Sequence, residues 1–239
     1  MKLRHFWLVS VAATGMLAAT GGPAAASADY ELAYWPMNEA PGSRTMHDAT
    51  GHGFDGRIGD DVAVGLRSGE RIAYGFERLE PDTPPAKPSH LVVVPDDDRL
   101  DPGTRDYAIG MRLRTRDYFG NIVQKGQATV AGGSFKLQIP NGRVQCWFRG
   151  SRTSLLVTAP EPINDGQWHT VRCERTGDGV TLFVDQREVA SRDGWTGSIA
   201  NSWPIAIGGK TTCDQVDVGC DYFAGDIDYI AVDVDEPGW

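Results

Sequence analysis

The sequence of 239 residues contains four cysteines and has a formal charge of −9, with 23 Lys and Arg against 32 Asp and Glu. Its hydrophobic share of 41% and charged share of 23% are ordinary for a globular protein and exclude a disordered, collagen-like or coiled-coil chain. An acidic chain lacks the basic surface that phosphate binding needs, which argues against a nucleic-acid partner. The 29 glycines and 14 prolines indicate many turns and favour a β-rich fold.

Residues 1–28 have the three parts of a secretory signal peptide. Two basic residues lie within the first four positions, an apolar stretch follows at residues 6–19, and the small residues 26–28 (ASA) form a cleavage site. The apolar stretch is shorter than the roughly 20 residues that span a bilayer, so we expect secretion without a membrane anchor. Without residues 1–28 the balance is 21 Lys and Arg against 32 Asp and Glu, a formal charge of −11.

Alternation of apolar and polar residues, rather than helical spacing, dominates the remaining chain. It is clearest at residues 107–114 (YAIGMRLR), 144–149 (VQCWFR), 170–175 (TVRCER) and 180–184 (VTLFV). Turn signals separate these runs, among them Asn-Gly at 141–142 and Asp-Gly at 165–166. The pattern predicts one all-β domain over residues 29–239, with two antiparallel sheets packed face to face and the Pro-rich residues 81–88 as a surface loop.

An even number of cysteines in a secreted chain predicts two disulfides, with three connectivities open. Alternation places Cys146 and Cys173 on the buried faces of their strands, where the side chains meet if the strands are neighbours. We therefore expect this pair and a second bridge, Cys213–Cys220, across a short acidic loop. A zinc site is the alternative, but the chain has no C-x-x-C pair and His169 is the only histidine near these cysteines.

The motif at residues 164–171 (NDGQWHTV), followed by residues 180–185 (VTLFVD), resembles the laminin G-like, concanavalin A-type jelly-roll family. That family has a D-G-x-W-H-x-V turn and strand, then a strand that ends in V-D-G; here Gln186 replaces the last glycine. Further segments agree in order: 35–39 (WPMNE), 48–53 (DATGHG), 100–103 (LDPG) and 222–230 (YFAGDIDYI). The resemblance implies a two-sheet sandwich but leaves function open, since this fold serves glycan binding, adhesion, catalysis and scaffolding.

Aromatic residues are the first candidates for ligand binding. In the resembled family the positions of Trp168 and His169 are structural, so we expect Trp168 in the core and His169 as a structural histidine. Trp147 differs, because alternation turns it away from the buried face that Cys146 occupies. An indole on the outer face either stacks on a sugar ring or is covered by a loop. Tyr222, in a loop-like stretch, is a weaker candidate of the same kind.

Arginines form a stripe on one face of residues 107–114. Arg112 and Arg114 share that face, and their guanidinium groups suit the sulfate or carboxylate groups of acidic glycans. The alternative is a solvated face on which the arginines pair with the chain's own carboxylates, and the negative net charge favours this alternative.

Calcium is the cofactor that the sequence suggests. Calcium needs six to eight oxygen ligands as a general rule, and members of the resembled family often hold one where the first and last strands lie side by side. Asp48, in a Gly-flanked turn, and Asp226 and Asp228, near the C-terminus, are the candidate ligands. The chain shows no dense run of alternating aspartates that would establish such a site from spacing alone.

No catalytic arrangement is legible in the sequence. A Glu-x-Asp-x-Glu strand and a Gly-x-Ser-x-Gly turn are both absent, so the paired carboxylates of a glycosidase and a serine nucleophile are not indicated. We therefore predict a secreted, non-catalytic module that binds an extracellular glycan with the help of calcium. A protein-binding or adhesion module is the alternative, and a jelly-roll enzyme that cleaves polysaccharides is a further one.

Overall fold

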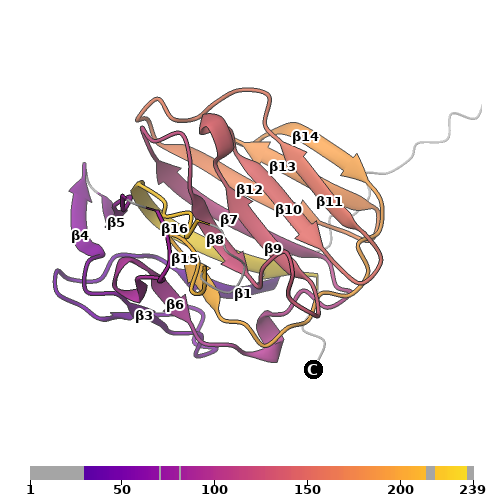
Figure 1. Cartoon of the computed structure of the whole chain (residues 1–239), viewed down its shortest axis with the longest axis horizontal. Helices are drawn as coiled ribbons and strands as arrows, with labels where there is room; N and C mark the ends of the chain where they lie inside the picture. The colour runs from indigo at the N-terminus through magenta and orange to yellow at the C-terminus, as the bar shows by residue number, and fades with distance from the viewer. Residues whose placement is uncertain (1–29, 70, 81, 214–218, 236–239) are drawn as a thin grey trace, which may run out of the picture.

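The computed structural model describes residues 30–69, 71–80, 82–213 and 219–235, which form two sheets packed face to face (Figure 1). Sheet A contains, in spatial order, β14 (Arg187–Asp193), β13 (Gly179–Val184), β12 (His169–Arg175), β7 (Tyr107–Arg114), β16 (Gly225–Val234), β5 (Arg71–Phe76) and β4 (Ala63–Ser68), with β1 (Tyr30–Trp35) paired to β16. Sheet B contains β11 (Ser154–Thr158), β10 (Gln145–Arg149), β9 (Ser134–Gln138), β8 (Asn121–Lys125), β15 (Ile205–Ile207), β6 (Val92–Val94), β3 (Gly56–Ile58) and β2 (Thr45–Met46). The predicted β-sandwich is confirmed.

Short helical turns complete the described chain: η1 (Pro88–His90), η2 (Asp98–Leu100) and η3 (Pro140–Gly142). In the residues described, no helix has the length and apolar character needed to cross a membrane. The predicted leader and most of the acidic loop between Cys213 and Cys220 lie outside the described residues.

The alternation of side chains decides which face of each strand enters the core. On β7, Ile109, Met111 and Leu113 are fully buried between the sheets. Arg112 and Arg114 take the intervening positions and point to the outer face, because successive side chains of a strand lie on opposite sides. The same rule operates on β10 and β12, so the outer face of each sheet carries a separate set of polar and aromatic residues.

Two disulfides stabilise this core, with the pairing that the sequence predicts. Cys146 of β10 and Cys173 of β12 are bonded and fully buried. The expectation that their strands are neighbours is wrong: β10 belongs to sheet B and β12 to sheet A, so the bridge crosses the core and joins the two layers. Cys213 and Cys220 form the second bridge, beside a smaller apolar cluster.

The first part of the described chain contributes to both layers. Strands β1, β4 and β5 lie in sheet A, whereas β2 and β3 lie in sheet B. β1 pairs with β16, which places the first strand beside the last one (Figure 1). Lys87, within the Pro-rich stretch, contacts the sandwich, since its backbone N–H donates to the hydroxyl of Tyr222 at 2.7 Å.

Candidate functional site

The outer face of sheet B carries one continuous row of side chains that includes Trp147. Since Cys146 and Phe148 are fully buried on the inner face, Trp147 between them points outward. Its register partners across β11, β9, β8 and β15 extend the row: Leu156, Lys136, Gln124 and Ala206. Strand pairing thus brings an indole, an ammonium group and an amide to the same face.

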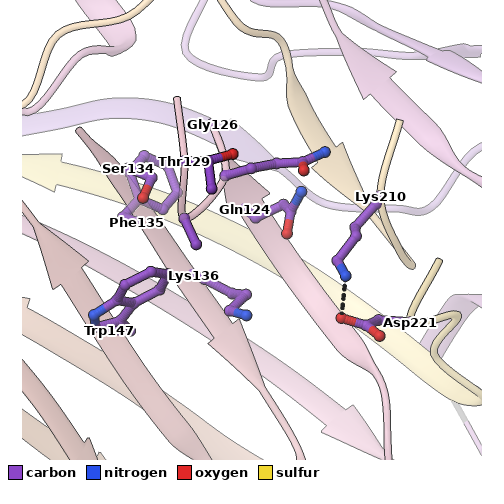
Figure 2. Close-up of a pocket in the computed structure, with 11 residues that line it drawn as sticks. Gln124, Gly126, Thr129, Ser134, Phe135, Lys136, Trp147, Lys210 and Asp221 are labelled. Atoms are coloured by element: carbon purple, nitrogen blue, oxygen red, sulfur yellow. Dashed lines mark ion pairs between the residues drawn. The ribbon is translucent and has the colours of Figure 1, made fainter. Parts of the chain in front are cut away.

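A pocket of about 390 Å³ opens on this row (Figure 2). Its walls come from β8, β9, β10, the loop after β8 and the segment around the second disulfide: Gln124, Gly126, Gln127, Ala128, Thr129, Ser134, Phe135, Lys136, Trp147, Lys210 and Asp221. We refer to it as the Trp147 pocket. Its size lies within the range of small-molecule sites, about 300–1,000 Å³.

Trp147 is held in place by its neighbours. Its indole N–H donates to the hydroxyl of Ser154, which fixes the ring toward β11. On the opposite side, the ammonium nitrogen of Lys136 lies 5.4 Å from the centroid of the indole ring. The ring remains half-buried, so part of its surface is available to a ligand.

Lys136 is the unusual charge of this pocket. It forms no ion pair within the described residues. Burial lowers the pKa of its ammonium group, and the negative charge of Asp221 offsets part of this lowering. Asp221 instead pairs with Lys210, whose ammonium nitrogen lies 2.7 Å from its carboxylate. Figure 2 shows this ion pair across the pocket from Trp147, with Lys136 between them.

Hydrogen-bonding groups surround the indole. The hydroxyl of Ser134 is buried against the pocket and has no hydrogen-bond partner in the described structure. One row away, the amide of Gln138 donates to Gln145, which in turn donates to the hydroxyl of Thr158 at 3.0 Å. The face therefore combines an aromatic ring with amide and hydroxyl groups.

The loop at residues 126–130 forms one wall of the pocket, and Arg149 of β10 holds it. One guanidinium nitrogen donates to the carbonyl oxygens of Gln127 and Val130, at 2.9 and 2.5 Å. The amide of Gln127 reaches the hydroxyl of Thr212 at 3.0 Å, which ties the loop to the segment before the second disulfide. The pocket wall is thus built into the fold.

The arginine stripe lies on the other side of the molecule, on the outer face of sheet A. Arg112 pairs with Asp228 at 2.7 Å, and Arg114 pairs with Asp226 at 2.6 Å. Both guanidinium groups also lie over the ring of Trp168, at 4.5 and 5.0 Å from its centroid. The structure therefore corresponds to the alternative in which the arginines pair with the chain's own carboxylates, and it separates them from the Trp147 pocket.

Trp168 and His169 lie at the same end of sheet A. The expectation that Trp168 belongs to the core is wrong, because its ring is half-buried on the outer face beneath two arginines. His169 is bonded on both ring nitrogens, at 2.8 Å to Asp185 and 3.2 Å to Asp165. It acts as a structural histidine that ties a turn to the start of β12.

Tyr222 is not available to a ligand, which corrects the candidate role that the sequence suggested. The residue is only 1% exposed and packs with Leu91 beside the disulfide Cys213–Cys220. Its hydroxyl accepts the hydrogen bond from Lys87. The neighbouring Asp221 reaches the Trp147 pocket instead.

The three aspartates proposed as calcium ligands do not assemble into a site. The carboxylate of Asp48 accepts hydrogen bonds from the backbone N–H groups of Tyr34, Thr50 and Phe54, at 3.1–3.2 Å, and from the Thr50 hydroxyl. Although burial would raise the pKa of Asp48, these hydrogen bonds hold it below its usual value.

Asp226 and Asp228 face arginines, and Asp228 contacts a second one, Arg71, at 3.0 Å. Among the described residues, no group of three or more His, Cys, Asp or Glu side chains is placed to hold a metal ion. Each of the three carboxylates already has at least one oxygen engaged by N–H donors or arginines, so these residues do not fit the ion as a set.

Sequence reasoning found Trp147 but missed the residues that surround it. Lys136 and Ser134 occupy alternate positions of β9, a pattern that predicts an outward face without indicating its neighbours. Lys210 and Asp221 are separated from Trp147 by more than 60 positions and carry no local motif. Only strand register and the return of the chain after β15 bring them together.

These features define an all-β sandwich with a pocket on one outer face. Residues 113–233, just over half of the chain, match the family model described as Laminin G domain, and the chain belongs to that family. Members of this family are typically extracellular modules that bind proteins or carbohydrates. The resemblance seen in the sequence is confirmed.

Curated proteins with similar sequences include Sex hormone-binding globulin of Phodopus sungorus, 32% identical over 101 residues, covering 41% of this chain and 25% of that protein. Neurexin-3-beta of Homo sapiens is 32% identical over 124 residues, covering 50% of this chain and 19% of that protein. The chain spans between 14% and 32% of the length of the curated relatives it matches. Their similarity therefore concerns a domain.

Solved structures agree on the fold. Domain 4 of AbnA, a GH43 extracellular arabinanase from Geobacillus stearothermophilus in complex with arabinotriose, has a TM-score of 0.60 and 16% identity, covering 86% of this chain and 93% of that one. The binding domain of Botulinum Neurotoxin serotype G has a TM-score of 0.60 and 11% identity, covering 86% of this chain and 47% of that one. At these identities the likeness concerns the fold alone.

Proposed function

We propose that this chain is a secreted, non-catalytic binding module that holds a carbohydrate in the Trp147 pocket. The observation that carries the proposal is the half-buried indole of Trp147. It shares one pocket with a buried hydroxyl (Ser134) and an ammonium group (Lys136) that have no hydrogen-bond or ion-pair partner, respectively, among the described residues. A sugar ring presents an apolar C–H face and a rim of hydroxyl groups. The first suits stacking on an indole, and the second suits these polar groups.

Within the part of the chain that the structure describes, Lys136 has no ion-pair partner and the Ser134 hydroxyl has no hydrogen-bond partner, which supports a ligand role over a purely structural one. A buried polar group without a partner costs stability, so a fold retains it where a ligand or ordered water completes its hydrogen bonds. A ligand hydroxyl or carboxylate within the pocket supplies such a partner to both residues. The non-catalytic part of the proposal rests on Asp221, the one carboxylate among the described residues that line the pocket. Its carboxylate is already paired with Lys210.

A protein-binding or adhesion module is the second candidate, and one observation favours it. Leu156, the neighbour of Trp147 on β11, is 38% exposed, so the indole and this side chain form an apolar surface at the edge of sheet B. Such a surface suits a flat protein partner better than a sugar. The two candidates differ at Leu156, since only a protein partner depends on it.

The deciding experiment screens the purified chain on a glycan array, next to Trp147→Ala and Leu156→Ser variants. Arabino-oligosaccharides are an appropriate first probe by calorimetry, because the arabinanase domain of similar fold was solved with arabinotriose. We expect a glycan signal that is lost in Trp147→Ala and retained in Leu156→Ser. An array without any signal, or a signal insensitive to Trp147→Ala, would contradict the proposal.

A further inference from the structure

A second depression, of about 420 Å³, lies on the outer face of sheet A, on the opposite side of the sandwich from the Trp147 pocket. Strand register explains why it exists. Gly110 of β7 pairs with Ala231 of β16 on one side and with Arg172 of β12 on the other. Two small residues side by side therefore lower the floor of the sheet at this point. We call it the Gly110 depression.

Neither the backbone nor the packing requires glycine at position 110. Gly110 is not among the residues with positive φ, and a Cβ atom added there meets nothing closer than a guanidinium nitrogen of Arg172, at 3.9 Å. Glycine in the interior of a strand is unfavourable because it loses more conformational freedom on folding than any other residue. In strands it often marks the place where a ligand approaches the backbone closely.

Aromatic residues stand on two sides of this floor. Phe183 of β13 is the register partner of Arg172, and Tyr229 lies two residues before Ala231 on β16. Tyr34, the register partner of Ala231 on β1, lies beside Tyr229, with the two ring centroids 5.9 Å apart. Both Phe183 and Tyr229 are half-buried, so a ring-shaped ligand on the floor has an aromatic neighbour at each side.

The charged groups around the depression are paired with one another. Arg172 contacts Glu174 at 2.6 Å and also contacts Asp233, and it is held between them. Next to it, Asp228 lies 2.7 Å from Arg112 and 3.0 Å from Arg71. Among the described residues that line the depression, the charged ones are Arg172 and Glu174, and they pair with each other, so its lining offers no unpaired charge to an ionic ligand.

Polar groups remain that can bind an uncharged ligand. The phenol hydroxyl of Tyr229 and the side-chain amide of Gln186 border the depression and form no hydrogen bond within the described residues. Aromatic walls with unused amide and hydroxyl groups suit a sugar ring better than a wholly apolar side chain, which would leave these groups without partners.

We propose that the Gly110 depression is a second carbohydrate subsite, specific for an uncharged sugar ring. The ring lies over Gly110 and Ala231 between Phe183 and Tyr229, and its hydroxyl groups bond to Tyr229 and Gln186. Because this subsite and the Trp147 pocket lie on opposite faces, one chain holds two separate glycan strands.

The test is a titration of the ¹⁵N-labelled chain with arabinotriose, xylotetraose, cellotetraose and trigalacturonate, followed by NMR. We expect at least one neutral sugar to shift the amide signals of Gly110 and Ala231, with trigalacturonate at least tenfold weaker there. Gly110→Val fills the depression with a residue that strands favour, and should weaken this binding at least tenfold. Gly177→Val is the control, since a Cβ at exposed Gly177 meets nothing within 4 Å.

The results distinguish binding at the Gly110 depression from binding at the Trp147 pocket. Trp147→Ala should leave the signals at Gly110 and Ala231 unchanged, so the second subsite stands or falls independently of the proposed function. The proposal is overturned if no neutral sugar shifts these signals, if trigalacturonate binds there as tightly, or if Gly110→Val binds as the wild type does. Tyr229→Phe keeps the ring and removes the hydroxyl, and a loss of affinity in this folded variant separates ligand contact from misfolding.

Discussion

The ammonium nitrogen of Lys136 lies 5.4 Å from the centroid of the Trp147 indole, on the neighbouring strand, and no carboxylate of the described chain pairs with it. A cation beside an aromatic ring gains some attraction from the ring electrons. That attraction does not fully replace the water that the ammonium group loses, because the pKa of Lys136 is lowered by burial. The pair therefore combines a stacking surface with a charge that lacks a counter-ion.

Removal of the indole should abolish carbohydrate binding with little effect on the fold. Trp147→Ala is expected to weaken glycan affinity at least tenfold, because stacking on one aromatic face contributes most of the contact area in such a site. The folding midpoint should stay within about 4 °C of the wild type, since the ring lies on the outer face. Calorimetry measures the first and thermal unfolding the second. A Trp147→Ala variant that is strongly destabilised, yet still binds the glycan under conditions in which it is folded, would contradict this assignment.

Replacement of Lys136 should separate stability from binding. Folding lowers the pKa of Lys136, so at neutral pH its charged form reduces the stability of the fold. This penalty decreases as pH rises through the folded pKa and is gone above the pKa of the unfolded chain. Lys136→Met should therefore raise the unfolding midpoint, by up to about 3 °C at pH 7, while it weakens glycan binding. Lys136→Arg retains the charge and serves as the control. A Met variant that is both less stable and fully competent to bind would refute a ligand role.

His169 should make the fold more stable in mild acid than in alkali. Burial lowers the pKa of His169, but its hydrogen bonds to Asp185 and Asp165 outweigh burial, and the net pKa is raised above 6.5. A raised folded pKa contributes stability below the unfolded pKa, and this contribution is lost as pH rises through the folded value.

His169→Gln should accordingly cost about 0.5 kcal/mol more at pH 5.5 than at pH 8.5, the size expected of a partly exposed ion pair. Urea unfolding at the two pH values measures the difference. An equal cost at both pH values would show that folding does not raise the pKa of His169.

The disulfide across the core should stabilise the fold more than the local one. Cys146 and Cys173 are separated by 27 positions, whereas Cys213 and Cys220 are separated by 7. In the loop-entropy description the longer loop contributes about 1 kcal/mol more, roughly 3.5 against 2.5 kcal/mol. The double variants Cys146→Ala/Cys173→Ala and Cys213→Ala/Cys220→Ala, unfolded by denaturant, should rank in this order. The reverse order would place the principal constraint outside the core.

Chelation should change neither stability nor binding. The carboxylates of Asp48, Asp226 and Asp228 are engaged by N–H donors and arginines, so we expect the fold not to depend on calcium at these residues. EDTA and added CaCl₂ should leave the unfolding midpoint within about 1 °C of each other. A rise of several degrees with calcium would locate a site built from other oxygen atoms of the chain.

The fold of this chain was predictable because its strands carry period-two patterns that are local in sequence. Residues 107–114 and 144–149 each assign one face to the core, and the structure follows both assignments. Trp168 is a case in which a sequence motif predicted the wrong environment for a side chain. The resemblance predicted a core tryptophan, yet two arginines of β7 cover the ring on the outer face, which depends on the register between β7 and β12.

The sequence by itself determined which side chains of each strand face inward, including Cys146 and Cys173, and the outward direction of Trp147. These properties follow from backbone geometry, which sends successive side chains of a strand to opposite faces. Only the tertiary structure decided that Lys136 and Asp221 share a pocket with Trp147, and that Gly110 lies beside Ala231. Strand register depends on pairing between distant segments, and no local pattern records which residues it makes neighbours.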